Sequence, residues 1–178
     1  MISISGIPGA GKSTLANALG HKEGRPVVRF DDFELLTSWP PTRVAEWLAQ
    51  GAPLSPDLAP GLMEAVEAAG PKAVLDHPFG RTWPGLEQSI DTAIWLDCPI
   101  DLALARKLAD LAVAGQGDPG FAGWLSGWLE AYSAVSRDAI TMLIENIPRK
   151  CDCIIDVGLT NQVNVFGEVC RCLTGRLG

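Results

Sequence analysis

The clearest chemical motif of this chain lies near its start, where residues 6–13 have the sequence GIPGAGKS and match G-x-x-x-x-G-K-[ST]. The motif follows a short apolar segment and opens a helical pattern, which is the context that a phosphate-binding loop requires. Its glycines let the backbone turn so that successive N–H groups converge on phosphate oxygens at the positive end of a helix dipole. We therefore expect a nucleotide to bind at Gly6, Gly9, Ala10, Gly11, Lys12, Ser13 and Thr14.

Three side chains of this loop have distinct expected roles. Lys12 places a positive charge between the β- and γ-phosphates, the Ser13 hydroxyl is a ligand for Mg²⁺, and Thr14 caps the helix or contacts the α-phosphate. The cofactors expected are ATP and Mg²⁺, and the sequence leaves open whether GTP can replace ATP. A glycine-rich turn that merely precedes a helix is disfavoured, because the pattern arises by chance on the order of once per hundred such chains.

Aspartates end three of the predicted strands, at Asp31, Asp76 and Asp97. Open α/β sheets bind their ligands beyond the carboxyl ends of the strands. Either Asp31 or Asp32 could deprotonate an acceptor hydroxyl, and we favour Asp31 because Asp32 is well placed to cap a following helix. Asp76 is expected to hold a water molecule on Mg²⁺, as the aspartate of a Walker-B motif does. The alternative is that it only forms the turn before Pro78.

Short β-rich runs alternate with longer helical stretches, which is typical of βαβ units around a parallel sheet. Strands are predicted over residues 2–5, 27–30, 73–76, 93–97 and 153–157. Helices are predicted over residues 12–19, 42–50, 57–69, 100–114, 123–146 and 161–173. The expected fold is therefore the three-layer α/β fold of phosphate-loop NTPases, with a five-stranded parallel sheet and a short lid.

Length and composition indicate one domain over residues 1–178. The chain is 47% hydrophobic and 20% charged, as expected for a globular domain with a single core. Within it we assign an acceptor-side segment to residues 34–70 and a lid to residues 106–127. The glycine-rich stretch 115–123 is expected to be flexible and to close over the nucleotide, so that water is excluded during transfer.

Charge and hydropathy exclude several partners. The net charge is −7, and no cluster of four or more basic residues is present, which disfavours nucleic acid. No apolar run approaches the roughly 20 residues that a membrane helix needs. The first 13 residues lack the features of a signal peptide, so we expect a cytoplasmic protein with no membrane partner. Nothing in the sequence indicates the oligomeric state.

Two C-x-C pairs, Cys151 with Cys153 and Cys170 with Cys172, lie among the five cysteines. An odd number of cysteines is not typical of a secreted disulfide framework. A zinc site is disfavoured because the first pair lies in a predicted strand, and the second pair would point about 200° apart on a helix. The role of these cysteines is left open.

Several segments resemble the nucleoside and nucleoside-monophosphate kinase branch of the phosphate-loop proteins, in particular uridine kinase-like enzymes. FDDFE at residues 30–34 is similar to the D-S-F segment with the acceptor-activating aspartate, which implies that role for Asp31. LDHPFGRT at residues 75–82 is similar to L-D-G-F-P-R-T of adenylate kinase-like proteins. This similarity implies that Asp76 is the magnesium-side aspartate and, allowing one extra residue, that Arg81 binds a substrate phosphate.

Two later segments extend the resemblance over most of the chain. Residues 95–110 resemble the fourth strand and lid-entry helix of these kinases, which implies that Arg106 neutralises charge during transfer, although a later arginine of the family's pattern is absent. Residues 132–158 resemble the tail of uridine kinases, which places Arg137 and residues 158–161 beside the nucleotide.

The acceptor side departs most from the family, since residues 34–70 carry no pattern that can be matched. Aromatic rings there could stack on a base or sugar, although core packing is the simpler role for most of the tryptophans. The expected substrate-binding residues are Asp32, Trp39, Arg43, Arg81 and Arg137, the catalytic residues Lys12, Asp31 and Arg106, and the metal ligands Ser13 and Asp76.

The resulting hypothesis is an ATP-dependent kinase. It would transfer the γ-phosphoryl group to a hydroxyl or phosphate of a nucleoside, nucleotide or sugar-like molecule. Two alternatives stay open: a phosphate-loop ATPase or nucleotide-dependent switch without a small-molecule acceptor, and a nucleotide-binding protein without catalysis.

Overall fold

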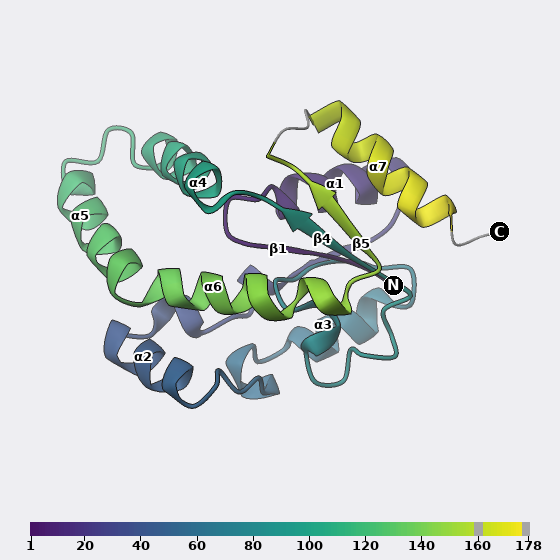
Figure 1. The fold of residues 1–178 in the computed structure, drawn as a ribbon, viewed down its shortest axis with the longest axis horizontal. Coiled ribbons are helices and arrows are strands. Elements are labelled where there is room, and N and C mark those ends of the chain that lie inside the picture. Colours follow the sequence, from purple (N-terminus) through teal and green to yellow (C-terminus); the bar gives the residue numbers. More distant parts are fainter. Residues whose placement is uncertain (159–161, 176–178) are drawn as a thin grey trace.

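The computed structural model describes residues 1–158 and 162–175 and contains a five-stranded parallel sheet with helices on both sides (Figure 1). The strands are β1 (Ile2–Gly6), β2 (Val27–Arg29), β3 (Val74–Asp76), β4 (Thr92–Asp97) and β5 (Cys153–Asp156). Their order across the sheet is β2-β3-β1-β4-β5, and every neighbouring pair is parallel. All five predicted strands, and the expected fold class, are confirmed.

The helices are α1 (Lys12–Glu23), α2 (Pro41–Ala49), α3 (Leu62–Ala69), α4 (Ile100–Ala114), α5 (Phe121–Ala131), α6 (Arg137–Asn146) and α7 (Gln162–Thr174). Figure 1 shows α1 and α7 on one side of the sheet and α3 and α6 on the other. The helix predicted from residue 57 begins only at Leu62, because Pro60 and the left-handed Gly61 (φ 84°) interrupt it. The helix predicted over residues 123–146 is instead α5, a π-helical turn (Tyr132–Ser136) and α6.

The burial of each strand agrees with its place in the sheet. The central strands β1 and β3 are buried along their whole length, and β4 is buried except at Asp97. This continuous burial is typical of parallel strands covered on both faces. The edge strands β2 and β5 instead mix buried and exposed residues. Because these strands are parallel, the carboxyl ends of β1, β2 and β3 lie together at one end of the sheet. The register there pairs Ile4 with Asp76 and Asp76 with Arg29.

A disulfide that the sequence did not indicate joins β5 to α7. It links Cys153 to Cys172, whose Cα atoms are 6.4 Å apart. Cys151 and Cys170 have free thiols, so one cysteine of each C-x-C pair is bonded and the other is not. The bond holds the C-terminal helix against the edge strand. Among the described residues, no helix is both long and apolar enough to cross a membrane.

Candidate active site

The phosphate loop connects β1 to α1 in a conformation that strongly favours glycine at two positions. Gly9 and Gly11 have left-handed φ angles of 85° and 93°. A Cβ atom on Gly9 would overlap the carbonyl oxygen of Ala103 on α4, so this loop packs directly against that helix. The N-terminus of α1 has no capping side chain and no acidic residue in its first turn. Its backbone N–H groups are therefore available to an anion.

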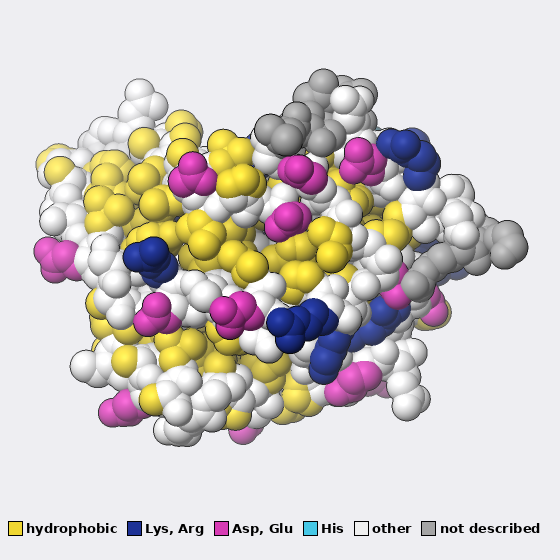
Figure 2. Space-filling model, in the orientation of Figure 1, with side chains coloured by type: hydrophobic (Ala, Val, Ile, Leu, Met, Phe, Trp, Pro, Cys, Tyr) yellow, Lys and Arg dark blue, Asp and Glu magenta, His cyan; other side chains and the backbone are white. Residues whose placement is uncertain are grey.

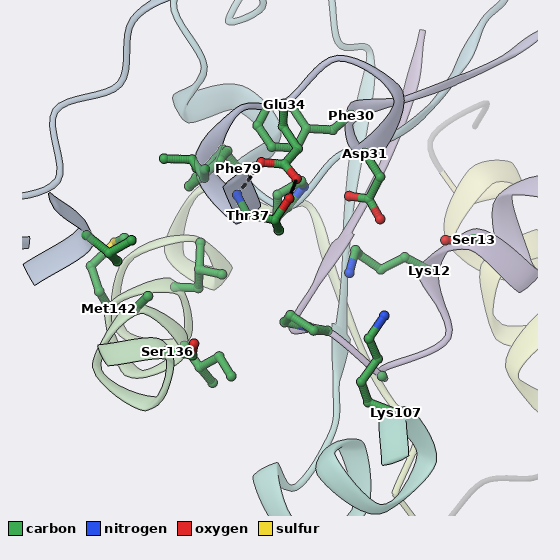
Figure 3. A pocket seen from close by; sticks show the side chains of 18 of the residues that line it. Lys12, Ser13, Phe30, Asp31, Glu34, Thr37, Phe79, Lys107, Ser136 and Met142 are labelled. Carbon is green, nitrogen blue, oxygen red and sulfur yellow. Dashed lines mark hydrogen bonds between the residues drawn. The ribbon is translucent and has the colours of Figure 1, made fainter. Parts of the chain in front are cut away.

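Lys12 extends along this loop, and its ammonium group donates a hydrogen bond to the carbonyl oxygen of Ile7 at 3.2 Å. Burial lowers the pKa of Lys12, whereas the negative charges of Asp76 and Asp31 raise it. Figure 3 shows the carboxylate of Asp31 facing this ammonium group. Lys12 is thus held at the mouth of the loop, in contact with protein oxygen and close to two carboxylates.

Asp76 ends β3, directly beside the strand that leads into the loop, and is 5% exposed. Burial raises the pKa of its carboxyl group, while a hydrogen bond from the Ser13 hydroxyl and the charge of Lys12 lower it. Ser13 and Asp76 therefore present two adjacent oxygen donors next to the phosphate loop. Mg²⁺ prefers such oxygen ligands, and it is usually held by one or two carboxylates together with substrate phosphates and water. The donor set fits the expected ion.

A cavity of about 400 Å³ opens beside the loop. One wall is the segment after β2, with Phe30, Asp31 and Glu34 (Figure 3). The opposite wall comes from the π-helical turn and α6, which contribute Ser136, Ala139, Ile140, Met142 and Leu143. π-Helical turns are frequent at functional sites. This wall could not be recognised in the sequence, because the apolar spacing of Ile140 and Leu143 indicates only that one face of the helix is buried and not what packs against it.

Of the two candidate bases, Asp31 lines the cavity and Asp32 does not. Trp39 and Arg43, both expected at the acceptor, contact each other instead, with the guanidinium carbon of Arg43 3.9 Å from the ring centroid of Trp39. Neither lines the cavity, whereas Trp47, which packs edge-on against Trp39, does.

The position of Arg81 contradicts its expected contact with a substrate phosphate. Its guanidinium group donates to the Asp152 carboxylate at 2.6 Å and to the carbonyl oxygens of Ile90 and Asp91 at 3.1 and 3.0 Å. These partners precede β4 and β5, so Arg81 lies at the amino ends of the strands, on the edge opposite the phosphate loop. Its side chain connects the loop that precedes β4 to the loop that precedes β5.

Arg106 faces a second cavity of about 330 Å³ on the other side of the loop. Its guanidinium group donates to the carbonyl oxygen of Val157 at 3.1 Å, next to Phe166 of α7. The neighbouring Lys107, which was not among the residues predicted for the site, lines the first cavity together with Asp110 and points toward Lys12 (Figure 3). Gly11 and Thr14 line both cavities, so the two cavities adjoin the same part of the phosphate loop.

Arg137, expected beside the nucleotide, is exposed at the start of α6 and lines neither cavity. Part of the segment 158–161, which was expected in the same place, lies outside the described residues, which resume at residue 162.

No protein-family model matches the chain, and no curated protein matches it in sequence. Solved structures do match it. A gluconokinase from Sinorhizobium meliloti 1021 superposes with a TM-score of 0.53 at 16% identity, over 98% of this chain and 91% of that one. A shikimate kinase from Aquifex aeolicus vf5 superposes with a TM-score of 0.54 at 14% identity, over 99% and 97%.

The chain has the fold of phosphate-loop small-molecule kinases. The expected resemblance to adenylate kinase-like proteins is confirmed at the level of the fold. Identities of 14% and 16% carry no information on the acceptor, which depends on the residues of the cavity itself.

Proposed function

We propose that the protein transfers the γ-phosphoryl group of ATP to a hydroxyl group of a small molecule. The observation that carries this proposal is the position of Asp31, which faces Lys12 from the segment after β2, in a cavity that opens onto the phosphate loop (Figure 3). A hydrolase or switch needs only water at this place. A cavity of about 400 Å³ with an apolar wall favours a kinase, because it offers room for an acceptor molecule.

The nucleotide would span both cavities. Its phosphates bind the N–H groups of the loop and the ammonium groups of Lys12 and Lys107, and its base enters the cavity beside Arg106 and Phe166. Arg106 then lies beside the nucleotide base and not beside the transferred phosphoryl group. This differs from its expected role, which was to neutralise charge during transfer. Thr14 lies between the two regions, close to the expected α-phosphate.

Transfer would proceed by in-line attack. Asp31 accepts the proton of the acceptor hydroxyl as its oxygen bonds to the γ-phosphorus, and the bond between that phosphorus and the β–γ bridging oxygen breaks to release ADP. Lys12 neutralises charge that develops on the phosphoryl oxygens. Ser13 and Asp76 would hold Mg²⁺, which when bound neutralises charge on the β- and γ-phosphates.

Residues 106–127 are proposed as the lid. This segment contains the end of α4 and the beginning of α5 rather than one long flexible loop, and Gly115 packs against the ring of Phe121. Figure 2 shows hydrophobic side chains gathered at this end of the molecule, where Val113 and Trp124 are 74% and 51% exposed. Movement of these helices over the nucleotide would exclude water and cover part of this apolar surface.

A screen of hydroxyl compounds for ADP release above the rate seen with water tests the proposal. Asp31→Asn should keep ATP binding and lose transfer, whereas Asp32→Asn, outside the cavity, should keep both. Full transfer activity in Asp31→Asn would remove this residue from the mechanism. ADP release that no acceptor increases would support the ATPase or switch instead.

A further inference from the structure

We propose that the acceptor is an amino alcohol, with a protonated amine that binds Glu34, an apolar body in the cavity and a hydroxyl that reaches Asp31. This inference rests on the proposed phosphoryl transfer and specifies the substrate class of the same site. It follows from the charges and side chains of the cavity wall.

The acceptor end of the cavity lacks the groups that bind an anionic substrate. Carboxylate and phosphate acceptors are usually held by arginine, whose planar guanidinium group forms paired hydrogen bonds with them. No arginine is among the described residues that line this cavity. Three candidates are engaged elsewhere: Arg81 bonds Asp152, Arg43 stacks on Trp39, and Arg106 faces the second cavity.

The lysines of the cavity lie at its phosphate end. Lys12 belongs to the loop, and Lys107 is close enough to lower the pKa of Lys12 through charge repulsion. Figure 3 shows both side chains on the loop side, away from Glu34. The phosphates of ATP would therefore neutralise these two cations, which leaves none of the described lining cations for an acidic acceptor.

Glu34 provides a negative charge at the opposite end. One oxygen accepts the backbone N–H of Thr37 at 2.9 Å and the other accepts its hydroxyl, so the carboxylate is fixed in orientation. Among the described residues, no lysine or arginine forms an ion pair with it. A carboxylate can accept about four hydrogen bonds, so each oxygen keeps capacity for an N–H donor of a ligand.

Aromatic and aliphatic side chains line the same cavity as this carboxylate. Phe30, Phe79 and Trp47 are among the residues that line it. Aromatic rings attract cations and also accept apolar groups, whereas they offer little to the hydroxyl groups of a sugar acid. An ammonium group on an apolar body matches both the charge of Glu34 and the aromatic rings that line the cavity.

The test uses three molecules on one scaffold: 2-amino-1-phenylethanol, which is a cation, 1-phenyl-1,2-ethanediol, which is neutral, and mandelate, which is an anion. Dissociation constants would be measured by ligand-observed NMR, with and without saturating Mg·ADP. We expect the amine to bind about tenfold more tightly than the diol, as one additional favourable charge contact provides, and mandelate to bind most weakly. Glu34→Gln should reduce the preference for the amine over the diol to within about twofold.

Glu46→Gln is the matched control, because Glu46 is exposed on α2 and does not line the cavity. It should keep the preference for the amine. The proposal is overturned if the diol or mandelate binds as tightly as the amine, if Glu34→Gln keeps the preference, or if no amine binding is detected up to about 10 mM, near the limit for a fragment of this size. Failure of Mg·ADP to bind would contradict the proposed function instead, and the titration without nucleotide separates the two results.

Discussion

The hydroxyl of Ser13, in the first turn of α1, lies close to the carboxylate of Asp76 at the end of β3 and helps to lower the pKa of that carboxyl group. The two residues are 63 positions apart in the sequence, and they meet because β3 pairs directly with β1. Burial raises the pKa of Asp76, so a cation at this place would compensate for charge that the protein surroundings disfavour. The pair therefore connects nucleotide binding to metal binding.

Asp76→Asn should raise the Mg²⁺ concentration required for half-maximal turnover by about tenfold or more, since it removes a charged ligand. In the unmodified protein, the metal requirement should increase as the pH falls, because the raised pKa lets protons compete with the metal. Magnesium titrations at several pH values measure both effects. Asp97→Asn, at an exposed strand end outside both cavities, is the control. An unchanged magnesium requirement in Asp76→Asn would contradict the assignment.

Gly9→Ala should prevent the loop from closing against α4, because the added methyl group overlaps the Ala103 carbonyl and the left-handed φ of 85° is unfavourable for alanine. We expect a loss of nucleotide affinity of at least about tenfold, together with a loss of about 2 kcal/mol or more in the free energy of unfolding. Gly167→Ala on α7 has open space around its Cβ, lies outside both cavities and the proposed lid, and should be neutral or slightly stabilising. Equal nucleotide affinities in the two variants would show that the close approach does not matter.

Arg81→Gln should lower stability without changing nucleotide affinity. The variant loses the ion pair with Asp152 and the hydrogen bonds to the loop before β4, so we expect the free energy of unfolding to fall by about 1–3 kcal/mol. The partly buried pair also explains why the Asp152 carboxylate raises the pKa of Arg81. Denaturant unfolding and nucleotide titration measure the two quantities, with the exposed Arg149→Gln as the control. If Arg81→Gln lost substrate affinity while its free energy of unfolding stayed unchanged, Arg81 would instead be a substrate-binding residue.

His77 should make the protein less stable as the pH falls. Its ring is buried against Phe30, Phe79 and Trp83, and burial together with the charge of Lys12 lowers its pKa from 6.5 to about 3. Between these two values the unfolded chain binds a proton that the folded chain does not. The free energy of unfolding therefore falls with decreasing pH, by up to about 1.4 kcal/mol per pH unit from this residue.

Denaturant unfolding of the wild type and of His77→Phe between pH 7 and pH 4 checks this expectation. The variant should lose the steeper part of the pH dependence, whatever its stability at neutral pH. Parallel pH profiles for the two proteins would show that His77 does not titrate in the expected way.

The sequence predicted those parts of the structure that are determined by residues close together along the chain. The phosphate loop is one continuous segment, and each strand is a short apolar run, so both were located to within a residue or two. Asp31 lines the cavity beside the phosphate loop because the carboxyl ends of parallel strands lie at the same end of the sheet, and its role toward an acceptor stays a prediction.

The arginines could not be placed in the same way, because a long side chain takes its direction from distant partners. Arg81 is oriented by Asp152, which lies 71 residues later. On α4, the choice between Arg106 and Lys107 depends on a rotation of about 100° between adjacent residues, and the sequence does not state which face meets the loop. The wall provided by α6 depends likewise on how two distant helices pack. These are tertiary relationships that local patterns do not contain.

Isothermal titration calorimetry of the intact protein with Mg·ATP, in parallel with Lys12→Ala, tests the central claim most directly. The account predicts saturable binding of one nucleotide to the wild type and affinity weakened by at least about tenfold in the variant, which lacks the ammonium group at the loop. Absence of binding heat with any magnesium–purine triphosphate, or equal affinity in the two proteins, would contradict it.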